Sequence, residues 1–171
     1  MERSDEFPYR HILFACDGNT CRSPFAEAML RKMLHDHGVD GQVSVSSGGV
    51  APHARDGSLI SLDMRMLMKD GEIPFDEDAF SQDMKRHPEL VEAADLILTM
   101  TQLQKERVQK LDTARGKQVW TLREFIGESG DITDPEGEGE QAYLACKQEI
   151  ERCLMKAVAG PLFASPHDRI L

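Results

Sequence analysis

Apolar and polar residues follow each other along this chain in blocks that predict strands and helices in alternation. Short apolar runs predict four strands, at His11–Cys16, Val43–Ser46, Asp95–Met100 and Gln118–Thr121. Longer stretches with helical apolar spacing predict five helices, at Arg22–His37, Leu59–Lys69, Gln82–Ala93, Leu103–Leu111 and Glu140–Val158. Gly127–Gly139 shows neither pattern and is predicted to be a loop.

This alternation predicts an α/β domain whose parallel sheet is covered by helices on both faces. We expect one domain over residues 1–171, with a core at about 11–158 and extensions at 1–10 and 159–171, the tail being loosely ordered. Ligands of such sheets bind beyond the carboxyl ends of the strands. Cys16 ends the first strand, which makes it the first candidate for function.

Composition and charge narrow the function classes. The chain is 40 % hydrophobic and 29 % charged, which suits a packed core. Its formal net charge of −10 argues against nucleic acid as a partner, because phosphate backbones require a surplus of Lys and Arg. We expect no signal peptide and no membrane span, since no apolar run approaches about 18 residues. The four cysteines lack zinc-site spacing and predict a reducing cytoplasm and no metal.

The segment Cys16–Pro24, with the sequence CDGNTCRSP, joins the first strand to a helix. A Cys, five residues and an Arg form a tight loop whose N–H groups can point inward at the positive end of the helix dipole. Gly18 would supply backbone freedom, and Asn19 tolerates left-handed geometry and can brace the loop. A lone Cys at a strand end is usually a core residue, but this conjunction of features predicts a cradle for a dianion.

Three side chains of this loop suit phosphoryl transfer. The field that binds a dianion also stabilises a thiolate, so we expect Cys16 to be nucleophilic near neutral pH. Arg22 offers a planar fork to two phosphoryl oxygens. Ser23 can donate to the Cys16 sulfur and help it to leave. The pattern predicts a phosphatase that acts through a cysteinyl-phosphate intermediate.

Such a reaction also requires an acid that protonates the leaving group. Asp134 is the better candidate in the Gly127–Gly139 loop, because Pro135 stiffens the backbone and favours an extended Asp134. The alternative is that Asp134–Pro135 simply begins a turn.

These residues together resemble the low-molecular-weight protein tyrosine phosphatase family, whose loop pattern C-x-G-N-x-C-R-S-P this chain matches at every fixed position. The resemblance covers about residues 11–158 and implies a single three-layer, Rossmann-like domain with a four-stranded parallel sheet and no metal or cofactor. It implies Cys16 as nucleophile, Arg22 as phosphate clamp and Asp134 as general acid. It further implies that the loop binds substrate and that Ser47 supports it, the other residues concerned being Asp17, Gly18, Asn19, Thr20, Cys21 and Ser23.

Within the family, the chain is most similar to the bacterial protein arginine phosphatases. Thr20 stands where tyrosine-specific members usually carry an aliphatic residue, and its hydroxyl can engage a phosphoramidate group. The resemblance therefore favours phosphoarginine in proteins as the substrate, with phosphotyrosine as the alternative. The alternative for Thr20 is a neutral substitution.

The chain departs from the family pattern at two positions. Glu136 follows Asp134–Pro135 where the family generally places an aromatic residue, and its carboxylate either pairs with a substrate guanidinium or belongs to a solvated loop. Asp17 carries a charge beside Cys16, and we expect its side chain to point to solvent.

Two other functions fit the cradle less well. Arsenate reductases share the loop but need a redox Cys pair near Leu98–Gln102, where this chain has none. Cys146 and Cys153 are explained better as part of one buried helix face. A binding module that holds phosphoproteins without turnover would not need the full set of Cys16, Arg22 and Asp134. A reversible disulfide between Cys16 and Cys21 would protect the nucleophile from over-oxidation.

Overall fold

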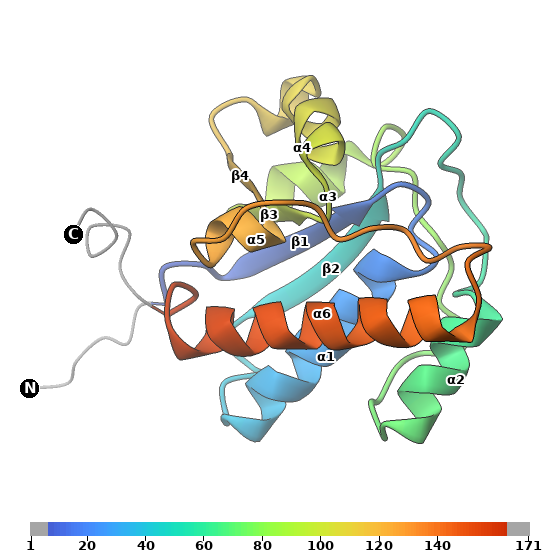
Figure 1. Cartoon of the computed structure of the whole chain (residues 1–171). Coiled ribbons are helices and arrows are strands. Elements are labelled where there is room, and N and C mark those ends of the chain that lie inside the picture. The colour runs from blue at the N-terminus through green and yellow to red at the C-terminus, as the bar shows by residue number, and fades with distance from the viewer. Residues whose placement is uncertain (1–6, 164–171) are drawn as a thin grey trace, which may run out of the picture.

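The computed structural model describes residues 7–163 and has a central four-stranded sheet (Figure 1). Its strands are β1 (His11–Cys16), β2 (Ser44–Gly49), β3 (Leu96–Thr99) and β4 (Gln118–Thr121). All neighbouring pairs are parallel and the order is β2-β1-β3-β4. The predicted four-stranded parallel sheet is confirmed. Its central strands are buried from Ile12 to Cys16 and from Leu96 to Thr99, because helices cover both faces of the sheet.

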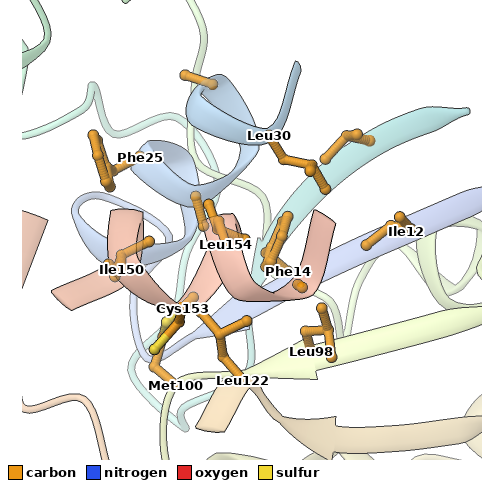
Figure 2. Close-up of a cluster of buried hydrophobic side chains, with 14 of the residues drawn as sticks. Ile12, Phe14, Phe25, Leu30, Leu98, Met100, Leu122, Ile150, Cys153 and Leu154 are labelled. Atoms are coloured by element: carbon orange, nitrogen blue, oxygen red, sulfur yellow. The ribbon is translucent and has the colours of Figure 1, made fainter. Parts of the chain in front are cut away.

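One face of the sheet carries the larger part of the core. Helices α1 (Arg22–Asp36) and α6 (Glu140–Ala159) lie against it, with α2 (Leu62–Asp70) and the short α5 (Leu122–Phe125) beside them. Figure 2 shows Phe14 of β1 between residues of α1 and α6, such as Leu30 and Leu154. All three side chains are at most 1 % exposed. This packing fixes the start of α1, and therefore the loop before it, against the end of β1.

The opposite face is covered by a smaller set of elements. These are α3 (Pro88–Ala93), α4 (Gln102–Gln109) and a 3-10 turn, η1 (Asp112–Ala114). Val91 and Val108 pack there on Leu13 and Ile97 of the sheet. The sheet therefore lies between two helical layers, as a three-layer α/β domain requires.

Two predicted helices are shorter than their apolar spacing indicated. The helix predicted at Gln82–Ala93 comprises only Pro88–Ala93, because the residues before it run beside β2, where Gly49 pairs with Asp83. Likewise α2 begins at Leu62 rather than Leu59, since Leu59 forms an antiparallel bridge with Phe80. The elements α5 and η1 were not predicted from the sequence. In both shortened helices, pairing with a distant segment replaced the local helical preference.

The packed core extends slightly beyond residues 11–158. Tyr9 and Leu162 are each 2 % exposed, and the rings of Phe7 and Phe163 meet edge to face. The expectation of a loose tail was therefore wrong for residues 159–163, while residues 164–171 lie outside the described part of the chain. Within that described part, no helix combines the length and apolar character that a membrane crossing requires.

Candidate active site

The loop from β1 to α1 is held at the carboxyl edge of the sheet. Cys16 is the last residue of β1 and pairs in register with Gly49 of β2. A Cβ atom added to Gly49 would lie 2.8 Å from the Asp17 carbonyl oxygen and 3.0 Å from the Gly18 carbonyl carbon. Glycine at position 49 thus lets the two backbones approach closely beside the nucleophile candidate.

Asn19 braces this loop from below. Its φ of 61° lies in the left-handed region, as predicted for an Asn here. Its side-chain nitrogen donates to Ser23 Oγ and to Ser47 Oγ, both at 2.9 Å, and its oxygen accepts from the Gln82 amide at 2.9 Å. Three separate segments of the chain therefore meet at one buried amide group.

Gly18 contributes less to the loop geometry than the sequence indicated. It is not among the glycines with positive φ, so its backbone does not use the freedom that the prediction assigned to it. A Cβ atom there would meet only Thr20 Oγ1, at 3.8 Å. Asn19 alone makes the left-handed turn of the loop.

Cys16 is 3 % exposed, and its sulfur has two hydrogen-bonding partners. It lies 2.9 Å from Ser23 Oγ and accepts from the Asn19 amide at 3.3 Å. Both groups can donate a hydrogen bond to this sulfur. The arrangement matches the expectation that Ser23 faces the sulfur.

Arg22 is 2 % exposed and connects the loop to a distant segment. Its Nη1 donates to the Ile132 carbonyl at 2.7 Å. Its Nη2 lies 3.1 Å from Asp17 Oδ2 and 3.8 Å from Asp134 Oδ2. These contacts bring the Gly127–Gly139 loop back over the cradle and place the acid candidate beside the guanidinium.

Asp134 is half-buried, and the residues on either side of it are held in place by a hydrogen bond and by burial. The Ile132 amide donates to the Met100 carbonyl at 2.9 Å, and Pro135 is buried. The Glu136 amide donates to Asp134 Oδ1 at 3.0 Å, which leaves Oδ2 facing Arg22. The carboxyl group is thereby oriented toward the same space as Cys16.

A cavity of about 530 Å³ opens above the cradle. Eight residues singled out from the sequence line it, namely Cys16, Asp17, Gly18, Thr20, Cys21, Arg22, Asp134 and Glu136. Asn19, Ser23 and Ser47 are not among its lining residues, in keeping with support rather than substrate contact. Sequence reasoning missed His53, Arg55 and Tyr143, which also line the cavity, because no local pattern places their segments at this edge.

The expectation that Asp17 points to solvent was wrong. Its side chain is 32 % exposed and lies between two arginines, 3.1 Å from Arg22 Nη2 and 3.5 Å from Arg107 Nη1. Arg107 comes from α4, on the opposite face of the sheet from α1. The charge beside Cys16 is therefore part of an ion-pair cluster.

Cys21 contacts a residue that the sequence did not connect with it. All four cysteines are free, and the Cys21 thiol hydrogen-bonds to Cys146 of α6. This hydrogen bond, together with burial, raises the pKa of Cys21 far above its usual range. Cys21 is therefore a protonated thiol at neutral pH. Cys146 and Cys153 are buried, as predicted for one helix face.

Residues 7–163 contain no group of three or more His, Cys, Asp or Glu side chains that could hold a metal ion. The cavity is lined by the thiol of Cys16, the guanidinium of Arg22 and the carboxyl groups of Asp17, Asp134 and Glu136, and Arg55 and His53 also lie at its wall. Such a set can hold a phosphoryl group and present a sulfur nucleophile to it.

Comparison with known proteins agrees with this geometry. The model of the low molecular weight phosphotyrosine protein phosphatase family matches residues 11–160. The chain belongs to this family. The matched range contains the whole sheet, the cradle and Asp134.

Two related sequences and one solved structure show how similar this chain is to other members of the family. A protein-arginine-phosphatase of Geobacillus stearothermophilus is 37 % identical over 147 residues, which cover 84 % of this chain and 90 % of the relative. The low molecular weight protein-tyrosine-phosphatase PtpB of Staphylococcus haemolyticus is 34 % identical over 143 residues, covering 84 % and 91 %. A structure of a YwlE arginine phosphatase mutant with a phosphorylated active-site serine superimposes with a TM-score of 0.77 at 30 % identity, covering 87 % and 93 %.

These relatives are hydrolases that bear the names of two phosphatase activities, so the chain is a protein phosphatase of this family. The sequence-based assignment of family, fold and enzyme class is confirmed. The relatives divide between arginine and tyrosine phosphatases, so the choice of substrate has to be argued from the cavity.

Proposed function

We propose that this phosphatase removes phosphate from phosphoarginine in cytoplasmic proteins. The observation that carries the proposal is the polar cavity around Cys16, where Thr20, Asp134 and Glu136 stand among the lining residues. A guanidinium group requires hydrogen-bond acceptors and negative charge, and these side chains supply both. Among the described residues, Tyr143 is the only Phe, Tyr or Trp that lines this cavity, and it is 7 % exposed and offers little ring surface.

In the first step, the Cys16 thiolate attacks the phosphorus atom and the P–N bond breaks. Arg22 and the amides of the cradle hold the phosphoryl oxygens, which carry most charge in the transition state. The electron pair of the broken bond goes to the leaving nitrogen, which takes a proton from the Asp134 carboxyl group. The products are arginine and a cysteinyl-phosphate.

In the second step, water attacks the phosphorus atom of the cysteinyl-phosphate. Asp134, now a carboxylate, accepts the proton of this water, and the Cys16 thiolate leaves with the Ser23 hydroxyl donating to it. Ser23 Oγ stands 2.9 Å from this sulfur, within reach for that role. The related YwlE mutant with a phosphorylated active-site serine supports a covalent phospho-enzyme.

Phosphotyrosine is the alternative substrate within the same mechanism. The similarity to PtpB favours it, as does the Tyr143 hydroxyphenyl group at the wall of the cavity. In that case Asp134 would protonate a phenolate oxygen, and Thr20 and Glu136 would not determine the choice of substrate.

The test compares kcat/KM on peptides of the same sequence that carry phosphoarginine or phosphotyrosine, with Cys16→Ser as the blank. We expect at least about a tenfold preference for phosphoarginine, equivalent to about 1.4 kcal/mol of transition-state discrimination. The double variant Thr20→Ile/Glu136→Phe should lose or reverse this preference. A wild-type preference for the phosphotyrosine peptide would overturn the proposed substrate. Activity equal to that of Cys16→Ser on both peptides would overturn the proposed phosphatase activity.

A further inference from the structure

The cradle contains a negative charge, which is unexpected in a site proposed to bind a phosphate dianion. Asp17 follows Cys16 directly and lines the same cavity as the nucleophile. A carboxylate at this position repels the phosphate dianion that the cradle has to bind, and it also neutralises Arg22, which lies 3.1 Å away. The same cavity is also lined by Arg55, but the ion pairs of Asp17 are with Arg22 and Arg107.

A second arginine reaches Asp17 from the far side of the sheet. Arg107 Nη1 lies 3.5 Å from Asp17 Oδ1, while Arg22 holds Oδ2. The Arg107 side chain is 31 % exposed, and its neighbour Val108 is fully buried against the sheet, which anchors this part of α4. Each carboxylate oxygen of Asp17 thus has one arginine partner.

Arg107 does not line the cavity above Cys16. It lines an adjoining hollow of about 470 Å³, and the two cavities share Asp17, Arg22, His53 and Asp134 as lining residues. Arg107 is therefore placed to act on the carboxylate of Asp17 rather than on the substrate.

We propose that Arg107 is a positioning residue of the phosphate cradle, which acts by pairing with Asp17. With this pair formed, the two arginines and one aspartate carry a net charge of +1, and the guanidinium of Arg22 can serve the phosphate. Without Arg107 the remaining pair is neutral, and Asp17 Oδ1 is free to repel the dianion. This inference concerns the site of the proposed function but needs only phosphate binding, and not turnover, to be tested.

The experiment measures binding of inorganic phosphate to the full chain by calorimetry, with and without Arg107. We expect Arg107→Gln to lower the affinity for inorganic phosphate about fivefold, as for the loss of a partly exposed ion pair. Lys110→Gln is the matched control, since it removes the same charge from the exposed end of the same helix, and it should change affinity less than twofold. Arg107→Lys, which keeps the charge, should retain most of the affinity.

The dependence on Asp17 separates this role from a structural one. In an Asp17→Asn background the Arg107→Gln change should cost less than twofold, because no carboxylate remains to be paired. With p-nitrophenyl phosphate as substrate, Arg107→Gln should raise KM more than it lowers kcat. Thermal unfolding of each variant checks that the chain remains folded.

Two results would overturn the proposal. One is an Arg107→Gln effect no larger than that of Lys110→Gln. The other is an equal effect with and without Asp17, which would mean that Arg107 acts on phosphate directly or on the fold. If wild-type protein binds phosphate with the expected coupling but turns over no phosphopeptide, the proposed function fails and the role of Arg107 stands.

Discussion

The cradle (Cys16–Pro24) and the loop Gly127–Gly139, called the acid loop because it carries Asp134, face each other across one cavity but are built differently. In the cradle, Asn19, Arg22 and Ser23 are at most 4 % exposed and joined by hydrogen bonds to three other segments. In the loop Gly127–Gly139, most residues are exposed, and all four glycines adopt positive φ. In the proposed mechanism, phosphate is therefore bound by buried groups, whereas the leaving group meets an exposed segment.

Because of this difference, we expect substitutions in the two regions to have different consequences. A change beneath the cradle disturbs a packed network and should affect every substrate alike. A change in the exposed loop alters the rim and should affect the choice of substrate. The exception is Asp134, which is half-buried and oriented by the Glu136 amide and Arg22. Three substitutions test this difference between the two regions.

Asp134→Asn should have the largest effect. It removes the proposed proton donor, so we expect kcat/KM on phosphopeptides to fall by about 10²–10⁴-fold. Phosphate affinity should not weaken, because Asp134 contributes no group that binds phosphate. Glu138→Gln, at an exposed position of the same loop, serves as the control. A loss of phosphate binding in calorimetry would mean that Asp134 belongs to the cradle, and the comparison would break.

Gly49→Ala tests the packing beneath the cradle. Its Cβ would meet backbone atoms of Asp17 and Gly18 at 2.8 and 3.0 Å, so the loop has to shift. We expect a loss of about 1–3 kcal/mol in the free energy of unfolding, measured with urea, and lower kcat/KM on all substrates. Gly41→Ala is the matched control, since nothing lies within 4 Å of its added Cβ. Equal stability of the two variants would show that the approach at Gly49 is not tight.

Glu128→Gln should have the smallest effect, confined to stability. Hydrogen bonds from Arg152 and Lys156 of α6 lower the pKa of Glu128 from 4.5 to about 2. A carboxyl group whose pKa is lower in the folded state stabilises the fold above its unfolded pKa, and this contribution disappears as the pH falls toward 2. The variant should therefore have a lower Tm than wild type at pH 7.

The pH dependence provides the check. The difference in Tm between Glu128→Gln and wild type should shrink as the pH falls from about 4.5 toward 2. kcat/KM at pH 7 should stay unchanged, because Glu128 lies at the base of the acid loop and outside the residues that line the cavity. A difference in Tm that is independent of pH would rule out the ion pairs as its cause.

The sequence alone determined the sheet, the cradle and the nucleophile candidate. Cys16–Pro24 is one continuous segment, so its strand, turn and helix start are encoded by neighbouring residues. The apolar runs of β1 and β3 are buried on both faces, a pattern that few other structures satisfy. The position of Asp134 followed from its proline and from the resemblance to the family. These predictions depend on residues that are close together in the sequence.

The tertiary structure alone decided which distant groups complete the site. Gln82 reaches Asn19 across 63 positions and Arg107 reaches Asp17 across 90. The same pairing that brings Gln82 to the cradle overrode the helical spacing predicted from Gln82 onward, because backbone hydrogen bonds to β2 outweigh a weak local preference. Partners of a charge or an amide depend on which loops converge at the carboxyl edge of the sheet. The spacing of residues along the chain does not predict which loops converge there.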